Sequence, residues 1–403
     1  MDSYGGNQGR IQRMKFDQWF KAVLGGLGLA AFVLVGACSS QTIQVKVAAP
    51  LTGDQAKSGK DVVNGAQLAV DDWNAKGGVL GKKIVMETGD DKGEPDQALI
   101  LAKEWTGKAD VIIGHYNSSC TLAAEEVYGK DHDLMITPSS TNPDVTDRGY
   151  LTIFRVCGRD DQQGKSAAQY IAATYPTAKV AVIHDKSSYG QDLANEFLKN
   201  FEFTTKTQAA FYGSIERSHV EFSSVVGKVK AAEPTVIYFG GLWPQGAELL
   251  KEIRKAGITA TFVSGDGCYD PEFIKQAGKD VAEGTLVTFI PDQEKIPTAQ
   301  SVVQAYKKRF GDLGPYSLYA YTAVTVALQG MQKANSRDGI DVAKALHKME
   351  VETPFGTMKF DEKGDPQQSP YVMWKVSDGK FVEVPAPAET PANAEASAEA
   401  TAK

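Results

Sequence analysis

The stretch ADVIIGHYNSSCTLAAEEVYGKDHDLMITPSST, residues 109–141, places a helical pattern between two short apolar runs. ADVIIG and LMITP have the length and composition of buried strands, and CTLAAEEVYGK between them is typical of a helix. Strands joined through a helix pair in parallel, and helices then cover both faces of the sheet. The stretch therefore predicts an α/β fold built on a parallel sheet.

The same alternation precedes this stretch and starts again after it. Residues 42–105 hold two further strand and helix pairs, and residues 151–289 repeat the pattern with strands such as KVAVIHD, TVIYFG and GTLVTF. The chain then becomes mainly helical through AQSVVQAYKKRF, SLYAYTAVTVALQGMQKA and IDVAKALHKM, and closes with the short strands GTMKF and YVMWKV. Two consecutive α/β sets predict two similar lobes.

The beginning of the chain has the pattern of a bacterial export signal. Basic residues precede an apolar run at 22–37, which is short for a spanning helix of about 20 residues. A cleaved leader is therefore favoured over an uncleaved membrane anchor. LVGAC resembles a lipobox, in which Cys38 is acylated and becomes the first residue, so that 1–37 is the signal peptide and 38–42 a linker. Met1 and Met14 both remain candidate starts.

Composition excludes some classes of function. The formal net charge of −7 argues against nucleic acid as a main partner. After the leader, Cys120, Cys157 and Cys268 allow at most one internal disulfide, and no Cys/His spacing predicts a metal site. Residues 385–403 consist mainly of Ala, Pro, Glu and Thr, which predicts a disordered tail.

Polar residues gather where the predicted strands end. The strand ends continue as HYNSS, PSST, KSSYG, GLWPQG and DGCYD, which are rich in hydroxyl, glycine and aromatic residues. In open α/β sheets, ligands bind beyond the carboxyl ends of the strands. The sequence therefore predicts a ligand site formed by these segments.

Two of the strand ends predict opposite charges on the ligand. Ser118 and Ser119 begin a helix, whose free N–H groups and dipole favour a carboxylate, unless a serine simply caps the helix. Asp266 lies between two glycines after a strand and is placed to meet an ammonium, unless it only bonds its own turn. GxSxG and HExxH motifs do not occur, and His115 and His184 are interpreted as structural, so the sequence gives little support for an enzyme.

Six segments together resemble the periplasmic branched-chain amino-acid-binding proteins, which are type I solute-binding proteins of ABC transporters. The resemblance covers residues 43–384 and rests on these segments in order: AAPLTGDQAKSGKDVVNGAQLAVDDWNAKGGVLGKKI, VIIGHYNSS, LMITPSSTNPDVTDRGY, FRVCGRDDQQGKSAAQYI, VAVIHDKSSYGQDLA and GPYSLYAYTAVTVA. It implies two doubly wound Rossmann-like lobes joined by a three-stranded hinge. The implied parts are lobe 1 at 43–159 and 290–368, lobe 2 at 160–289 and 369–384, and crossovers near 158–161, 289–291 and 368–370.

The resemblance also implies how an amino acid is held. Ser118 matches a serine that binds the α-carboxylate, and Asp266 matches the acidic residue that pairs with the ammonium. In PSST, the backbone of Ser139 and the hydroxyl and N–H of Thr141 match groups that hold both charges, and Ser140 between them is also expected to bind the ligand. Tyr189 matches a tyrosine of lobe 2 that closes over the ligand.

The implied side-chain pocket departs from the family pattern. Leu242, followed by Trp243, stands where relatives have a tyrosine, and Ser58 stands where many have an aromatic residue. Gly93 and Asn117 occupy the positions of a disulfide found in some relatives. The implied clamp for the zwitterion is kept, whereas the preference among leucine, isoleucine, valine and other neutral amino acids stays open.

The resemblance implies an extracytoplasmic receptor that delivers a free amino acid to the permease subunits of an ABC importer. We expect a monomer without cofactor or metal, located in the periplasm and anchored to the membrane through the lipid on Cys38. The alternatives are a sensor that docks on a membrane receptor and an enzyme built on the same scaffold.

Overall fold

The computed structural model describes residues 42–216 and 222–387. The predicted leader, its acylated Cys38 and residues 388–403 of the predicted tail lie outside the described residues. Within the described part of the chain, no helix combines the length and the apolar character needed to cross a membrane.

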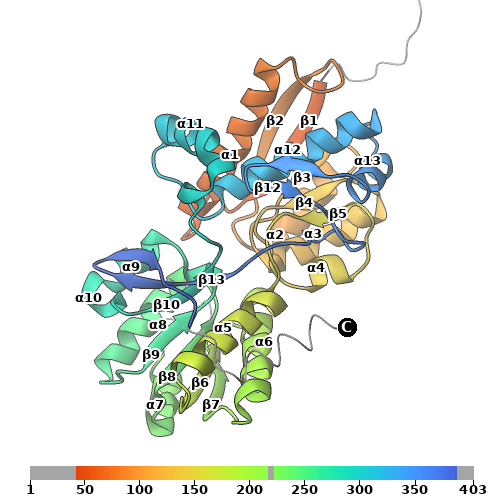
Figure 1. Ribbon diagram of the computed structural model, residues 1–403. Helices are drawn as coiled ribbons and strands as arrows, with labels where there is room; N and C mark the ends of the chain where they lie inside the picture. The colour runs from red at the N-terminus through yellow and green to blue at the C-terminus, as the bar shows by residue number, and fades with distance from the viewer. Residues whose placement is uncertain (1–41, 217–221, 388–403) are drawn as a thin grey trace, which may run out of the picture. The chain divides into compact units, whose positions relative to one another are not determined.

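The first sheet contains five strands in the order β2-β1-β3-β4-β5 (Figure 1). Every neighbouring pair is parallel. The strands are β1 (Thr42–Ala49), β2 (Lys83–Asp90), β3 (Val111–Ile113), β4 (Met135–Thr137) and β5 (Ile153–Arg155). The predicted unit at residues 109–141 is therefore β3, the helix α3 (Ser118–Lys130) and β4.

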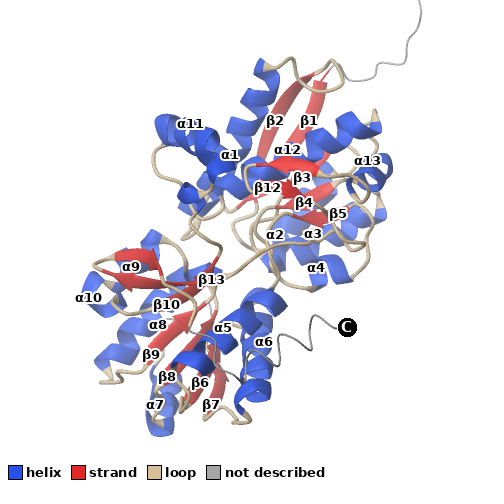
Figure 2. Ribbon diagram, viewed as in Figure 1, coloured by secondary structure: helices blue, strands red, loops and turns tan. Residues whose placement is uncertain are grey.

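Successive residues of these strands enter different cores. Val45, Ile113 and Ile136 join one core with residues of α1 (Ala56–Ala75) and α12 (Ser317–Ala334). Ile112 and Met135 join another with residues of α2 (Pro95–Trp105) and α3. Because side chains alternate across a strand, helices cover both faces of the sheet (Figure 2).

The second sheet has seven strands in the order β14-β13-β10-β9-β8-β6-β7, and β13 and β14 run antiparallel to their neighbours. Its strands are β6 (Val180–His184), β7 (Phe211–Ser214), β8 (Val236–Gly240), β9 (Thr261–Ser264), β10 (Leu286–Phe289), β13 (Val372–Ser377) and β14 (Lys380–Glu383). One core on this sheet contains side chains of α5 (Asp160–Thr174) and α6 (Ser188–Thr205). The other contains side chains of α7 (Ser223–Ala232), α8 (Trp243–Lys255) and α9 (Pro271–Ala277).

The chain passes between the two sheets three times. It leaves the first sheet after β5, returns after β10 to pack α12 against that sheet, and enters the second sheet again at β13. The segment between β10 and β13 carries α12 and also α11 (Gln300–Phe310), α13 (Gly339–Leu346) and the hairpin of β11 (Val351–Thr353) and β12 (Gly356–Met358). The short helices α4 (Asp144–Asp147) and α10 (Lys279–Ala282) and the 3-10 helices η1 (Asp266–Cys268), η2 (Gln293–Lys295) and η3 (Pro297–Ala299) complete the described elements.

The predicted α/β class with two lobes is confirmed, and the predicted helix at residues 317–334 is α12. The sequence interpretation missed β7, β11 and β14. Each is short and partly exposed, so its apolar content is low and pairing with a neighbour decides its conformation. The lobe boundaries inferred from the family resemblance stay predictions.

Candidate functional site

A cavity with an empty volume of about 390 Å³ lies where strands of both sheets end. Its lining comes from segments of both lobes. The first lobe contributes Tyr116, Asn117, Ser118, Ser119, Ser139 and Tyr316, and the second contributes Ser187, Tyr189, Leu242, Asp266 and Gly267. The predicted site at the strand ends is therefore present as a cavity, and five of the nine predicted ligand-binding residues line it.

The first turn of α3 faces this cavity. Asn117 occupies the N-cap position, so the alternative that Ser118 or Ser119 caps the helix is wrong. Ser118 is the first helical residue, is 3% exposed, and accepts a hydrogen bond from the N–H of Asn142 at 3.4 Å. The first N–H groups of a helix have no partner within the helix and favour an anion. A carboxylate in the cavity would meet both these groups and the Ser118 hydroxyl.

Asp266, on the opposite side of the cavity, is buried between two tyrosines. Tyr189 donates to its Oδ1 at 2.9 Å and Tyr316 donates to its Oδ2. Burial raises the pKa of Asp266, while the two phenol hydrogen bonds oppose that rise. Each carboxylate oxygen keeps a further lone pair, so the group is still able to accept a hydrogen bond from an ammonium.

The glycines beside Asp266 make this arrangement possible. A Cβ atom on Gly265 would lie 2.8 Å from the Tyr189 hydroxyl, and one on Gly267 would lie 2.7 Å from Cε1 of the same ring. The N–H of Gly267 also donates to the Tyr189 hydroxyl at 2.9 Å. The SGDG segment therefore gives Tyr189 room to reach the carboxylate.

The three hydroxyl residues of PSST have different surroundings. Ser139 lines the cavity and donates to the carbonyl of Tyr116 at 2.8 Å. Ser140 points into the protein, where its hydroxyl contacts the carbonyl of His115 at 3.1 Å and the Thr121 hydroxyl at 2.7 Å. Thr141 is also buried away from the cavity, beside Asp160. The binding roles predicted for Ser140 and Thr141 stay predictions.

Asp160, which the sequence interpretation overlooked, is the first residue of α5 and is fully buried. Within the described part of the chain, neither its carboxylate oxygens nor the adjacent Thr141 hydroxyl has a hydrogen-bond partner of good geometry. Burial first, and then the charge of Asp266, hold the pKa of Asp160 well above its usual range. The signal in the sequence was the paired acid in GRDDQQG after a strand.

The remaining predicted positions surround the cavity. Leu242, the N-cap residue of α8, lines it, whereas Trp243 belongs to the adjacent core. Ser58 is buried outside the lining and its hydroxyl donates to Asp270 at 3.0 Å. Two aromatic residues that were not predicted, Tyr116 and Tyr316, also line the cavity. Their rings meet edge to face with centroids 5.6 Å apart. From the sequence alone, an aromatic residue at a strand end that lines a cavity cannot be distinguished from one that packs in a core.

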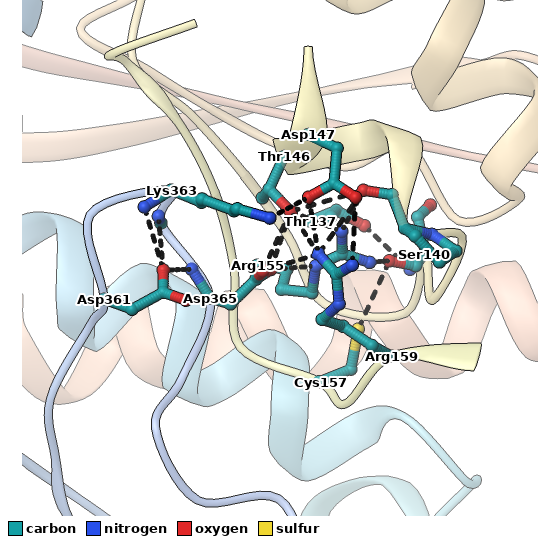
Figure 3. A network of polar contacts seen from close by, with 12 residues as sticks. Thr137, Ser140, Thr146, Asp147, Arg155, Cys157, Arg159, Asp361, Lys363 and Asp365 are labelled. Atoms are coloured by element: carbon teal, nitrogen blue, oxygen red, sulfur yellow. Dashed lines mark hydrogen bonds and ion pairs between the residues drawn. The ribbon is translucent and has the colours of Figure 1, made fainter. Parts of the chain in front are cut away.

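A buried charge network supports the PSST loop from behind (Figure 3). Arg155 donates to Asp365 at 2.5 Å and to the carbonyl of Ser140 at 2.7 Å. Arg159 donates to the other oxygen of Asp365 at 2.7 Å and also pairs with Asp147. The network therefore ties the loop that carries Ser139 to the crossover segment after β5.

The described residues offer no alternative chemistry based on metal or thiols. Among residues 42–216 and 222–387, no group of His, Cys, Asp and Glu side chains is arranged to hold a metal ion. Among the described residues, Cys120, Cys157 and Cys268 are buried and no two of them form a disulfide, which answers the question that the sequence left open. Burial raises the pKa of the Cys268 thiol to about 12, so this thiol is neutral and unreactive near neutral pH.

Two α/β lobes that share a cavity lined by serines, tyrosines and one aspartate at their strand ends are typical of a solute-binding protein. The sequence profile of the family described as "Periplasmic binding protein" matches residues 42–380. The chain belongs to this periplasmic binding protein family.

Similar proteins agree with this assignment. The chain is 37% identical to a Leu/Ile/Val-binding protein homolog 1 of Brucella suis over 90% of this chain and 98% of that protein. It is also 37% identical to an amino acid binding protein of Pseudomonas aeruginosa over 85% and 92% of the two chains. The crystal structure of a leucine binding protein LivK from Thermotoga maritima superposes with a TM-score of 0.79 at 27% identity, covering 85% of this chain and 98% of that one.

Proposed function

We propose that the chain is the extracytoplasmic receptor of an ABC importer and captures a free α-amino acid between its two lobes. The observation that carries this proposal is the charge pattern at the cavity. Asp266 faces it from one side, where two phenols donate to its carboxylate, and the fully buried Asp160, which interacts electrostatically with Asp266, has no hydrogen-bond partner of good geometry among the described residues. The N-terminus of α3 and Ser118 face the cavity from the other side.

A zwitterion complements both sides of this cavity. Its ammonium would provide the positive charge that the buried carboxylates lack, because a buried charge is costly unless it is paired. Its carboxylate would accept hydrogen bonds from Ser118 and from the first N–H groups of α3. A sugar offers neither charge, and a polyamine offers only the positive one.

The walls around the clamp favour a neutral side chain on the ligand. Apart from Asp266, the lining side chains are uncharged, and Tyr116, Tyr316 and Leu242 supply most of its apolar part. The names of the relatives, which bind leucine or amino acids, support the same class of ligand. Membership in a family of binding proteins also agrees with the predicted absence of catalysis.

The decisive experiment is a thermal-shift screen of the mature chain against all proteinogenic amino acids, with sugars and polyamines as controls. A ligand present at one hundred times its dissociation constant stabilises the bound state by about 2.7 kcal/mol. We expect at least one neutral α-amino acid to raise the Tm. A screen in which only sugars or polyamines score would overturn the proposed clamp.

Lipid anchoring of a monomer at the membrane is a separate part of the proposal and rests on LVGAC alone. Mass spectrometry of the protein from its native membrane should find a diacylglyceryl-modified Cys38 as the first residue. A chain that retains residues 1–37, or one that begins after an unmodified Cys38, would contradict it.

A further inference from the structure

Asn142 connects the two sides of the cavity without lining it. Its Nδ2 atom donates to the carbonyl of Ser188 at 2.9 Å and to Oδ2 of Asp192 at 2.6 Å. Asn142 follows the PSST loop of the first lobe, whereas Ser188 and Asp192 lie on the first turns of α6 in the second lobe. Residues four apart on a helix share one face, so one amide group contacts both acceptors.

The same side chain also fixes its own loop. Its Oδ1 accepts from the N–H of Asp144 at 2.9 Å, at the beginning of α4, and its backbone N–H donates to the Ser118 hydroxyl. Asn142 is fully buried. A carboxamide is the small side chain that both accepts at the loop and donates across to α6, whereas an aspartate would only accept.

The two segments that Asn142 joins carry groups of the proposed clamp. The PSST loop presents Ser139 to the cavity, and the first turn of α6 presents Tyr189, which holds Asp266. A contact across the lobes exists only while they are closed, so it raises the population of the closed state. The apparent affinity of a ligand falls in proportion to that population.

We propose that Asn142 is a positioning residue that latches the lobes closed through Asp192 and the Ser188 carbonyl, and so sets the affinity for every ligand without choosing among them. This inference rests on the proposed function, because it concerns closure over a bound amino acid. It goes beyond that function by assigning part of the affinity to a contact outside the cavity.

The test is calorimetry of the mature chain and its Asn142→Asp variant with glycine, L-alanine and L-leucine as probes. The variant keeps the oxygen that accepts from Asp144 but removes the donor and places a second carboxylate against Asp192. We expect the affinity to fall about tenfold or more, because the loss of a buried hydrogen bond to a charged group changes an equilibrium constant by at least that factor. The weakening should be the same for each probe that binds, because Asn142 does not touch the ligand.

Two further variants separate a latch from a general structural defect. Adding Asp192→Asn to Asn142→Asp reverses the polarity of the pair and should recover most of the lost affinity. Asp192→Ala alone, on α6, should weaken binding about threefold to tenfold. This variant provides the test if Asn142→Asp does not fold. Gln67→Glu is the matched control, because Gln67 donates to Asp71 at 2.9 Å within α1 and its change should leave affinity unaltered.

The outcomes distinguish the latch from the proposed function. If the unmodified chain binds none of the proteinogenic amino acids, the proposed function fails and the latch with it. If it binds one and Asn142→Asp binds within twofold of it, or changes the preference between two probes, the latch alone is overturned. Uniform loss with recovery in the double variant supports it.

Discussion

Two buried acidic clusters lie next to each other on this chain, and they are completed in opposite ways. Asp365 receives hydrogen bonds from both Arg155 and Arg159 and from the Thr146 hydroxyl, so protein cations balance its charge (Figure 3). Asp160 follows Arg159 directly in the sequence, yet within the described residues its oxygens have no hydrogen-bond partner of good geometry. Asp266 accepts hydrogen bonds from two tyrosine hydroxyls, which carry no positive charge.

This contrast distinguishes buried carboxylates that stabilise the fold from buried carboxylates that are available to bind a ligand. A buried carboxylate that is already paired with arginine stabilises its surroundings and has little to gain from a solute. A buried carboxylate without a cation lowers the stability of the unliganded protein, and the binding of a cation offsets that destabilisation. Of the three carboxylates Asp365, Asp160 and Asp266, only Asp266 lines the cavity.

Breaking the balanced cluster should have the largest effect, and on stability. Arg155→Met removes one of the two arginines that pair with Asp365 and the guanidinium that donates to the Ser140 carbonyl, so we expect the free energy of unfolding in urea to fall by about 3–5 kcal/mol. Lys363→Met is the control, because Lys363 is half exposed and contacts Asp147 at the edge of the same network. Its loss should be about 1 kcal/mol or less. Equal losses in the two variants would refute the distinction between a buried and a peripheral pair.

Neutralising Asp266, the carboxylate that lines the cavity, should instead weaken ligand binding. Asp266→Asn takes away the charge that faces the ammonium, so calorimetry should show affinity reduced about 30-fold or more, as when one partner of a desolvated pair is lost. The unliganded variant should unfold at a Tm no lower than that of the unmodified chain, because an unpaired buried charge has been removed. Near-unchanged affinity would mean that the ammonium is held elsewhere.

The two clusters should also differ in their pH dependence. The pKa values of Asp160 and Asp266 are raised by burial, so the unliganded folded state binds more protons than the unfolded chain between about pH 4 and those raised values. Its unfolding free energy therefore increases as the pH falls through that window. The pKa of Asp147 is lowered to about 2, chiefly by its hydrogen bond to Arg159, so its stabilisation is present above about pH 4 and is lost toward pH 2.

Titration of the same two carboxylates should also make the ligand affinity depend on pH, in the direction opposite to that of their effect on stability. An ammonium favours the ionised carboxylates, so affinity should fall as the pH is lowered through the raised pKa values, by up to about tenfold per pH unit for each proton displaced. Calorimetry in buffers of different ionisation enthalpy should detect protons released on binding. Affinity that stays constant from pH 8 down to about pH 4, the ordinary pKa of an aspartate, would contradict the assignment of the ammonium to this cluster.

On the carboxylate side the expected effect is smaller. Ser118→Ala removes one hydroxyl but leaves the N–H groups at the beginning of α3, so we expect a loss of about 1.5 kcal/mol, roughly tenfold in affinity. Calorimetry on this variant and on Asp266→Asn ranks the two sides of the clamp. A larger loss for Ser118→Ala would reverse that ranking.

The smallest effect on the clamp should come from its apolar wall. Leu242→Ala enlarges the cavity without touching either charged side, so the order of preference among neutral amino acids should change. Binding of glycine, which has no side chain to meet this wall, should stay within about threefold of the unmodified chain. A large loss for glycine would place Leu242 in the clamp itself.

Much of the molecule was predictable from local patterns. Alternating apolar runs and helical repeats predicted the α/β class and the duplicated lobes, because strand and helix periodicities are written into neighbouring residues. Glycine, serine and acidic residues at strand ends predicted where the ligand site lies, since parallel strands bring these ends to one edge. Ser118, Ser139, Tyr189, Leu242 and Asp266 were found in this way and line the cavity.

What the tertiary structure decided was which polar groups are already satisfied. Nothing in the sequence separates Arg159, which pairs with Asp365 about two hundred residues away, from the adjacent Asp160, whose oxygens have no hydrogen-bond partner of good geometry among the described residues. Ser139 and Ser140 are likewise identical in type and adjacent, yet one faces the cavity and the other bonds the carbonyl of His115. Burial and partnership depend on residues distant in the chain. The sequence by itself therefore determined the architecture and the location of the site, and only the folded chain determined which charges remain for a ligand.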